Sequence, residues 1–169
     1  FRLGIPYYVF NFTEEFREKV IGKFTASYCQ GLTPNPCIDC NRYLKFGKLF
    51  ERADLLGCDH IATGHYARIE QRGGKYLLKK ALDPAKDQSY VLYAMTQAQL
   101  ARTLFPLGDR TKADSRAAAR SAGLLNAEKP DSQDICFVPA GDYARVVELH
   151  TGRAAEPGDF MDPEGRVLG

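Results

Sequence analysis

The spacing of hydrophobic residues predicts a short strand followed by two amphipathic helices. Residues 5–10 are rich in aromatic and β-branched side chains and are predicted to form the strand. Apolar residues then recur at every fourth position up to Phe24, which predicts a helix with Thr13 as its N-cap. A second apolar face predicts a helix over 41–56 that ends at Gly57. Each helix is therefore predicted to have one buried face.

Short strands are predicted in the middle of the chain. Residues 60–63 are a short apolar run that leads into Gly64, which predicts a buried strand. Residues 67–70 and 75–79 flank two consecutive glycines and predict a hairpin. Helices and strands alternate at the spacing of crossover connections, so we expect an α/β fold with a parallel sheet.

The second half of the chain is predicted to be mainly helical. Helices are predicted at 89–104, 112–122 and 142–150, and a strand at 135–138. From Thr151 onward glycine and proline are frequent. We therefore expect an α/β domain over 1–150, and a linker with the start of a small β domain over 151–169.

Composition and charge are those of an ordinary globular domain. Hydrophobic residues make up 44% and charged residues 26%, and the net charge is +2, so any nucleic-acid surface must be a local patch. No apolar run approaches the roughly 20 residues of a membrane helix. The sequence begins without an initiator Met or a signal-peptide pattern. We expect a cytoplasmic protein, and a chain cut from a longer one.

Two cysteines in a C-x-x-C pattern, Cys37 and Cys40, are the first candidates for chemistry. A zinc site would need a second ligand pair, which the sequence lacks, and a thioredoxin-type pair would follow a strand rather than a proline-rich loop. A catalytic thiol is the third interpretation. Cys40 is predicted to open a helix, where the helix dipole lowers a thiol pKa, and Arg42 and Lys45 lie within one turn. The odd number of cysteines, five, argues against a structural disulfide framework.

Three other polar segments have both a functional and a structural interpretation. Gly64 and His65 follow a predicted strand end, where open α/β sheets bind ligands, although a single histidine is more often structural. Residues 86–90 are a polar cluster that would also serve as a helix N-cap. Cys136 follows a polar turn and by itself is best interpreted as a core cysteine.

Five segments occur in one order along nearly the whole chain: GLTPNPCIDCN at 31–41, IATGHYAR at 61–68, KDQSY at 86–90, FPLG at 105–108 and DSQDICF at 131–137. Together they resemble the motifs of the tRNA-specific 2-thiouridylases, the MnmA family. The resemblance implies a Rossmann-like, parallel-sheet adenine-nucleotide domain of the PP-loop ATPase type. It also implies an ATP-dependent sulfurtransferase that uses ATP with Mg and makes 2-thiouridine at the wobble position of Lys, Glu and Gln tRNAs.

The same resemblance implies roles for particular residues. Cys40 corresponds to the nucleophile, and Cys136 to the cysteine that carries the persulfide sulfur received from a sulfur-relay donor protein. These two cysteines would close a disulfide as sulfur is released. Asn35, Pro36 and Cys37 correspond to the segment that contacts the target base.

Further residues correspond to positions that bind the nucleotide and the tRNA. Gly64 corresponds to a nucleotide-binding backbone position. His65, Lys86, Asp87 and Gln88 correspond to tRNA contacts. A persulfide suits this chemistry, because it is a more acidic and softer nucleophile than a thiol.

The sequence departs from the family pattern in two respects. The Ser-Gly-Gly-Val-Asp-Ser pyrophosphate loop is absent, so we expect the 169 residues alone to be inactive. Some members have Asp at the position of Cys37. With Cys there, Cys37, Cys40 and Cys136 form an alternative ligand set for an iron–sulfur cluster that would perform the same thiolation. A non-catalytic metal-binding or RNA-binding module is the other alternative.

Overall fold

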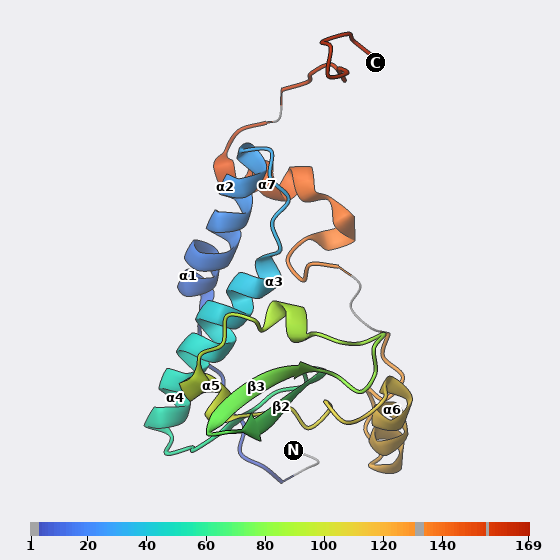
Figure 1. The fold of residues 1–169 in the computed structure, drawn as a ribbon. Coiled ribbons are helices and arrows are strands. Elements are labelled where there is room, and N and C mark those ends of the chain that lie inside the picture. The colour runs from blue at the N-terminus through green and yellow to red at the C-terminus, as the bar shows by residue number, and fades with distance from the viewer. Residues whose placement is uncertain (1–3, 131–133, 155) are drawn as a thin grey trace.

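The first helical rod of the protein has three consecutive segments. In the computed structural model, which describes residues 4–130, 134–154 and 156–169, α1 (Thr13–Phe16) continues through a π-helical segment (Arg17–Gly22) into α2 (Lys23–Cys29) (Figure 1). The side chain of Asn11 accepts the Thr13 N–H at 3.0 Å. The predicted N-cap role of Thr13 is therefore wrong, because the side chain two residues earlier satisfies the first free amide of the helix.

The second rod comprises α3 (Pro36–Asp39), a π-helical segment (Cys40–Lys48) and α4 (Leu49–Leu55). It begins earlier than the predicted residue 41. Asn35 is the N-cap, and its Oδ1 accepts the Cys37 N–H at 3.1 Å. Proline is compatible with the first helical position because the amide it lacks would have no helical partner there. Pro36 therefore starts this helix, and Cys40 lies inside it rather than at its opening.

Two small sheets lie beside the second rod. β1 (Ile61–Ala62) pairs in parallel with β4 (Thr103–Leu104), which confirms the parallel sheet predicted for residues 60–63. β2 (Ala67–Arg72) and β3 (Lys75–Lys80) form an antiparallel hairpin, as predicted. Its turn places both glycines at positive φ, a conformation that side chains disfavour.

Two predicted strands are wrong. Residues 5–10 have no strand partner among the described residues, and within them the rings of Tyr8 and Phe10 stack with centroids 6.3 Å apart. Residues 135–138 form a turn, in which Val138 N–H donates to the Ile135 carbonyl at 2.9 Å, and a 3₁₀ turn (Pro139–Gly141) follows. An apolar run becomes a strand only where a neighbouring backbone offers hydrogen bonds, and here Val138 is instead buried against helices.

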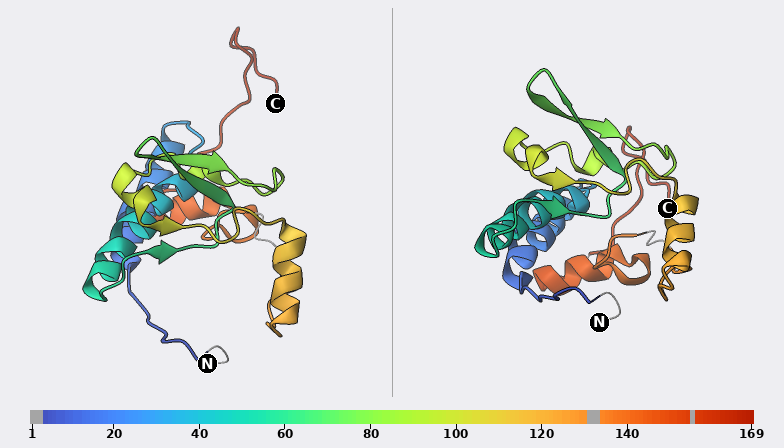
Figure 2. Two further views of the ribbon diagram at one scale, coloured as in Figure 1. Left: turned by 60° about the horizontal axis from the view of Figure 1, so that its bottom comes forward. Right: turned by 90° about the horizontal axis from the view of Figure 1, so that it is seen from below.

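The remaining helices agree with prediction in part. The predicted helix at 89–104 is divided into a 3₁₀ turn (Ser89–Val91), α5 (Gln97–Ala101) and β4. The other two helices are confirmed as α6 (Lys112–Ser121) and α7 (Tyr143–Thr151). Figure 2 shows α6 projecting from the rest of the molecule.

The segment after α7 contains little regular structure. One antiparallel bridge joins Met161 and Val167, so the predicted start of a small β domain is not confirmed. The domain boundary near residue 150 stays a prediction. Within the described ranges, every helix is too short or too polar to cross a membrane.

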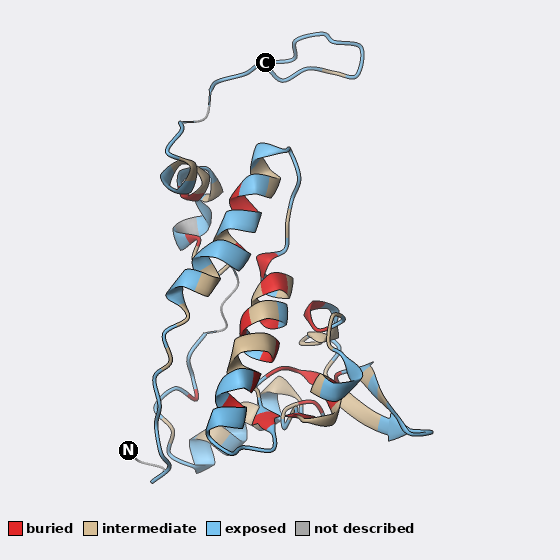
Figure 3. Cartoon of the chain, turned by 90° about the vertical axis from the view of Figure 1, so that its left-hand side faces the viewer, coloured by how far each residue is buried: buried red, intermediate tan, exposed pale blue. Residues whose placement is uncertain are grey.

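The core has two parts, and the second rod contributes heavily to the larger one (Figure 3). The larger cluster joins this rod to β1, β2 and the 3₁₀ turn; its buried members are Phe46, Phe50, Ala53, Ile61, Ala67, Val91 and Leu92. The smaller cluster joins α2 to α7 and to the turn at 135–138 through Phe24, Val138 and Val146. Ile38 of the C-x-x-C segment packs against the larger cluster, and both neighbours of Cys136, Ile135 and Phe137, pack against the smaller one.

Candidate functional site

The C-x-x-C segment lies at the start of the second rod and is anchored by two polar contacts. The Asn41 side chain donates to the Cys37 carbonyl at 2.9 Å. Asp39, between the two cysteines, is buried and accepts a hydrogen bond from Lys23 of α2 at 2.7 Å. Sequence reasoning missed this ion pair, because the spacing of Lys23 and Asp39 in the sequence does not show that two rods pack there. These two contacts tie the C-x-x-C segment to the following turn and to α2.

Cys136 is exposed, in a turn anchored on the first rod. The ring of Phe137, the next residue, meets Phe16 edge-on with centroids 5.5 Å apart and Phe24 at 5.1 Å. Since α2 also holds α3 through Lys23, one helix connects the Cys136 turn to the C-x-x-C segment. The first three residues of the motif at 131–137 lie outside the described residues.

The three thiols interact electrostatically. Burial raises the pKa of Cys37, a negative charge on Cys136 raises it further, and Lys45 opposes both. Burial also raises the pKa of Cys40; Lys45 lowers it, and Cys136 and Cys37 raise it. Cys136 therefore lies within electrostatic range of both other thiols, although it is distant in sequence. The expected low pKa of Cys40 is wrong, because Cys40 is inside the helix and partly desolvated.

The structure holds these cysteines as free thiols. All five cysteines are unpaired, so the disulfide implied by the resemblance is not present. Among the described residues, no group of three or more His, Cys, Asp or Glu is arranged to hold a metal ion. The iron–sulfur alternative for Cys37, Cys40 and Cys136 stays a prediction.

An open hollow of about 500 Å³ lies at the carboxyl end of β1, which we call the β1 hollow. Its lining residues are Lys45, Leu49, Ala62, Thr63, Gly64, His65 and Gln88. The volume is within the usual range of small-molecule sites, and the carboxyl end of a parallel strand is the usual position of a nucleotide. A Cβ on Gly64 would meet only Leu107 Cδ1 at 3.9 Å, so the space beside the Gly64 backbone is not filled by the protein.

His65 is buried beside the hollow and is neutral. Its ring contacts Phe46 and Phe105, with centroid distances of 5.9 and 6.0 Å, and these two rings also contact each other at 6.3 Å. Burial, and then the charge of Lys45, lower its pKa to about 4. Its Nδ1 is 2.8 Å from Thr63 Oγ1, and its Nε2 is 3.5 Å from Lys45 Nζ. Since most of the side chain is covered, the tRNA contact predicted for His65 stays a prediction.

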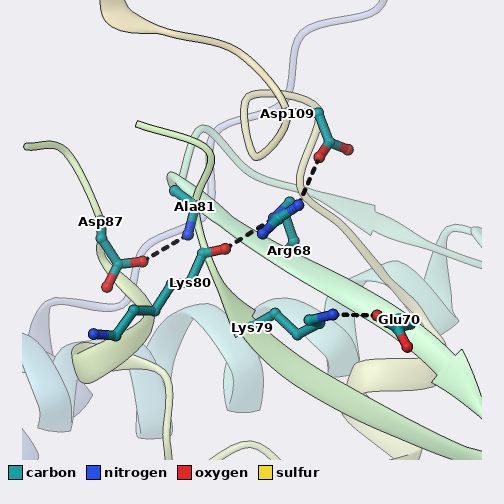
Figure 4. Close-up of polar contacts among 7 residues, drawn as sticks. All are labelled: Arg68, Glu70, Lys79, Lys80, Ala81, Asp87 and Asp109. Atoms are coloured by element: carbon teal, nitrogen blue, oxygen red, sulfur yellow. Dashed lines mark hydrogen bonds and ion pairs between the residues drawn. The ribbon is translucent and has the colours of Figure 1, made fainter. Parts of the chain in front are cut away.

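Residues 86–88 connect the hollow to the hairpin. Gln88 pairs twice with the backbone of Tyr66: its Oε1 accepts the Tyr66 N–H at 3.0 Å, and its own N–H donates to the Tyr66 carbonyl at 2.8 Å. The carboxylate of Asp87 accepts the Ala81 N–H at 2.8 Å (Figure 4) and the Ser89 hydroxyl at 2.8 Å. Partial burial raises the pKa of Asp87, but these hydrogen bonds outweigh it and leave the pKa below its usual value.

These contacts give Asp87 and Gln88 a structural role at the edge of the hollow. Lys86 lies half-buried beside them. Figure 4 also shows how the hairpin is fixed to the neighbouring loop: Arg68 donates to the Lys80 carbonyl at 2.8 Å and pairs with Asp109 at 3.6 Å. The tRNA contacts predicted for 86–88 stay predictions.

The motif at 105–108 packs against two residues that line the β1 hollow. Phe105 packs edge-on against His65, and Leu107 lies beside Gly64. Gly108 lies against β2 so closely that a Cβ there would be 2.0 Å from the Ala67 carbonyl oxygen. The sequence shows a glycine after Phe-Pro-Leu, but only the packing shows that the backbone of Ala67 leaves no room for a side chain there.

The parallel pair, the hollow at its carboxyl end and the helices around it define an α/β domain with a candidate nucleotide site. The sequence matches the family described as tRNA methyl transferase HUP domain over residues 1–140, and the chain belongs to that family. This finding supports the predicted Rossmann-like, PP-loop ATPase-type fold.

The names of the similar proteins are more specific than the description of the family. The chain is 50% identical over 169 residues to a tRNA-specific 2-thiouridylase MnmA of Clostridium acetobutylicum, covering 100% of this chain and 48% of the relative. It is 54% identical over 170 residues to that of Carboxydothermus hydrogenoformans (99% and 47%), and 55% identical over 168 residues to that of Xanthobacter autotrophicus (99% and 43%). The similarity to 2-thiouridylases inferred from the motifs is confirmed. The chain spans about half the length of these relatives.

Proposed function

We propose that this chain is the catalytic part of an ATP-dependent tRNA sulfurtransferase that makes 2-thiouridine at the wobble position. The observation that carries the proposal is the electrostatic coupling of Cys136 to both cysteines of the C-x-x-C segment. Lys45 interacts with Cys40 and also lines the β1 hollow, so the thiols and the hollow are adjacent. The names of the relatives supply tRNA as the substrate and thiolation as the reaction.

The first step activates the uracil. Its C2 oxygen attacks the α-phosphate of ATP, the P–O bond to pyrophosphate breaks, and the N3 proton leaves. The oxygen then becomes part of a good leaving group, AMP. The β1 hollow, with the Gly64 backbone at its edge, is the proposed position of the nucleotide. Magnesium would accompany the ATP phosphates, as it does in other nucleotide-using enzymes.

The second step transfers sulfur. The terminal sulfur of a Cys136 persulfide loses its proton and attacks C2, and AMP leaves with the oxygen. The Cys40 thiolate then attacks the Sγ of Cys136. The bond from Sγ to the transferred sulfur breaks, 2-thiouridine regains its N3 proton, and a Cys40–Cys136 disulfide forms. The two cysteines thereby supply the two electrons that reduce the sulfur, and an external dithiol reductant restores them.

The exposure of Cys136 is consistent with this assignment. A persulfide must arrive from a donor protein, and the Cys136 thiol lies at the surface. Asn35, Pro36 and Cys37 are proposed to contact the target base, and His65 with 86–88 to contact the tRNA. The proposed substrates are the Lys, Glu and Gln tRNAs, and the proposed location is the cytoplasm, where thiols remain reduced.

Three serine variants of the full-length protein test the proposal. Serine has the size of cysteine but cannot carry a persulfide. Cys40→Ser and Cys136→Ser should both bind tRNA and ATP and fail to make 2-thiouridine. Only Cys136→Ser should fail to accept ³⁵S-labelled sulfur from a donor, because Cys136 is the proposed persulfide carrier.

Cys37→Ser is the matched control from the same helix turn. It should retain substantial thiolation, because the proposed role of Cys37 is only to line the base site. An inactive, colourless Cys37→Ser beside a brown, iron-containing wild type would contradict the persulfide route and support the cluster. A wild type that binds RNA but neither consumes ATP nor transfers sulfur would support a non-catalytic module.

A further inference from the structure

Lys45 lies between the two parts of the candidate site, the cysteines of the C-x-x-C segment and the β1 hollow. It lies on the second rod, its side chain lines the β1 hollow, and its charge acts on Cys37, on Cys40 and on His65. The next lysine on the rod, Lys48, is instead paired with Glu51 at 3.0 Å. Among the described residues that line the hollow, Lys45 carries the only charge, because His65 is neutral.

The contact between Lys45 and His65 determines which way each hydrogen bond runs. An ammonium group can only donate, so His65 Nε2, at 3.5 Å, must be the acceptor. A neutral imidazole has one acceptor nitrogen, and its Nδ1 therefore carries the proton and donates to Thr63 Oγ1 at 2.8 Å. A protonated ring would repel Lys45.

The ring itself has little freedom to move. It packs against both Phe46 and Phe105, and only 6% of the residue is exposed. Thr63 directly follows β1, and its N–H donates to the Leu104 carbonyl of β4. The hydrogen bond from Thr63 to the His65 ring therefore holds Nε2 in a set position relative to the sheet. A long, flexible lysine side chain thus meets a fixed neutral acceptor at the rim of the hollow.

We propose that Lys45 binds the phosphate of the nucleotide in the β1 hollow, and that His65 and Thr63 are positioning residues that hold its ammonium group there. This inference rests on the proposed function, since it takes ATP to be the ligand. The hollow offers a cation, the Gly64 backbone and the Gln88 side chain, which suits a small anionic ligand. When the persulfide sulfur attacks C2, the same ammonium stabilises the charge on the departing AMP.

The test compares AMP with adenosine in equilibrium binding to the full-length protein, since the two ligands differ only by the phosphate. Lys45→Met should weaken AMP binding about tenfold or more and leave adenosine binding within about twofold. Lys45→Arg, which keeps the charge, should restore much of the AMP affinity. Lys48→Met is the matched control and should bind both ligands as the wild type does.

His65 is tested by two variants that keep most of its packing. His65→Phe keeps a ring but removes the acceptor, and should weaken AMP binding several-fold while adenosine binding is retained. His65→Gln places an amide oxygen near the position of Nε2 and should recover part of the loss. A purely structural role for His65 would weaken both ligands equally.

The outcomes separate this inference from the proposed function. If the wild type binds AMP and thiolates tRNA while Lys45→Met binds AMP equally well, the role of Lys45 is wrong and the proposed function stands. Equal losses for AMP and adenosine, or a loss of tRNA affinity with AMP binding intact, would also overturn the role of Lys45. A wild type that binds no adenine nucleotide would overturn the proposed function itself.

Discussion

Replacing Gly108 by alanine should destabilise the protein strongly, because the added Cβ has no room. It would lie 2.0 Å from the Ala67 carbonyl oxygen and 2.9 Å from the Ala67 carbonyl carbon, both backbone atoms of β2. A normal contact requires more than 3 Å, so the loop must move by roughly 1 Å or more. Neither neighbour is a flexible side chain that could turn away.

That movement disrupts two backbone hydrogen bonds. The Gly108 carbonyl accepts the Leu82 N–H at 2.8 Å, and the Gly108 N–H donates to the Phe105 carbonyl at 3.0 Å. Overpacking costs about 1–3 kcal/mol, and each weakened hydrogen bond about 0.5–1.5 kcal/mol. We expect the free energy of unfolding to fall by about 2–6 kcal/mol.

The assay is urea unfolding of the full-length protein, followed by far-UV circular dichroism. With a slope of about 2 kcal/mol/M, the midpoint of the transition that includes this domain should fall by about 1–3 M. AMP binding should weaken as well, because Phe105 and Leu107 of the same loop support His65 and Gly64.

Gly64→Ala is the matched control for stability. Its Cβ would meet only Leu107 Cδ1 at 3.9 Å, an ordinary contact, so the midpoint should hardly change. If Gly108→Ala shifted the midpoint no more than Gly64→Ala does, the close approach to Ala67 would not constrain this position.

Two further predictions concern titrating groups. Because the pKa of Asp87 lies below its ordinary value of 3.8 in the fold, its charge stabilises the protein above that pH, and the benefit is lost as the pH falls through the lower, folded value. The stability difference between wild type and Asp87→Asn in urea should therefore shrink below about pH 4, and a difference that grew there would contradict the assignment. Burial raises the pKa of Cys40 above its ordinary value of 9.0. The alkylation of Cys40 by iodoacetamide, measured by peptide mapping in the ligand-free protein, should therefore be half-maximal above pH 9.0. A midpoint below pH 9.0 would instead support the activated thiolate expected from the sequence.

Local chemistry explains where prediction from the sequence succeeded. The hairpin at 67–80 depends on two glycines between β-forming runs, and these act within a few residues. The helix at 112–121 depends on Thr111 and Asp114, which cap each other's backbone amides, and on Gly123 after its end. Such signals are readable because donor and acceptor are neighbours in the sequence.

The candidate site was predictable as a set of residues but not as a geometry. The motifs identified Cys37, Cys40, Gly64 and His65 as candidates, and the family match supports the resemblance, while the roles of these residues stay predictions. They did not reveal that Asp39 is paired with Lys23, or that Gly108 touches β2. Both contacts join segments far apart in the sequence, so no local pattern records them.

The sequence by itself determined the family of this protein and its motif residues. It also determined the helices and the hairpin whose hydrogen bonds join residues close in the sequence. Only the tertiary structure decided that residues 5–10 and 135–138 are not strands, that Cys40 has a raised pKa, and that His65 is neutral beside Lys45. The physical reason is common to all of these. A strand requires a partner backbone, and a pKa depends on burial and nearby charge, and both are supplied by residues that become neighbours only when the chain folds.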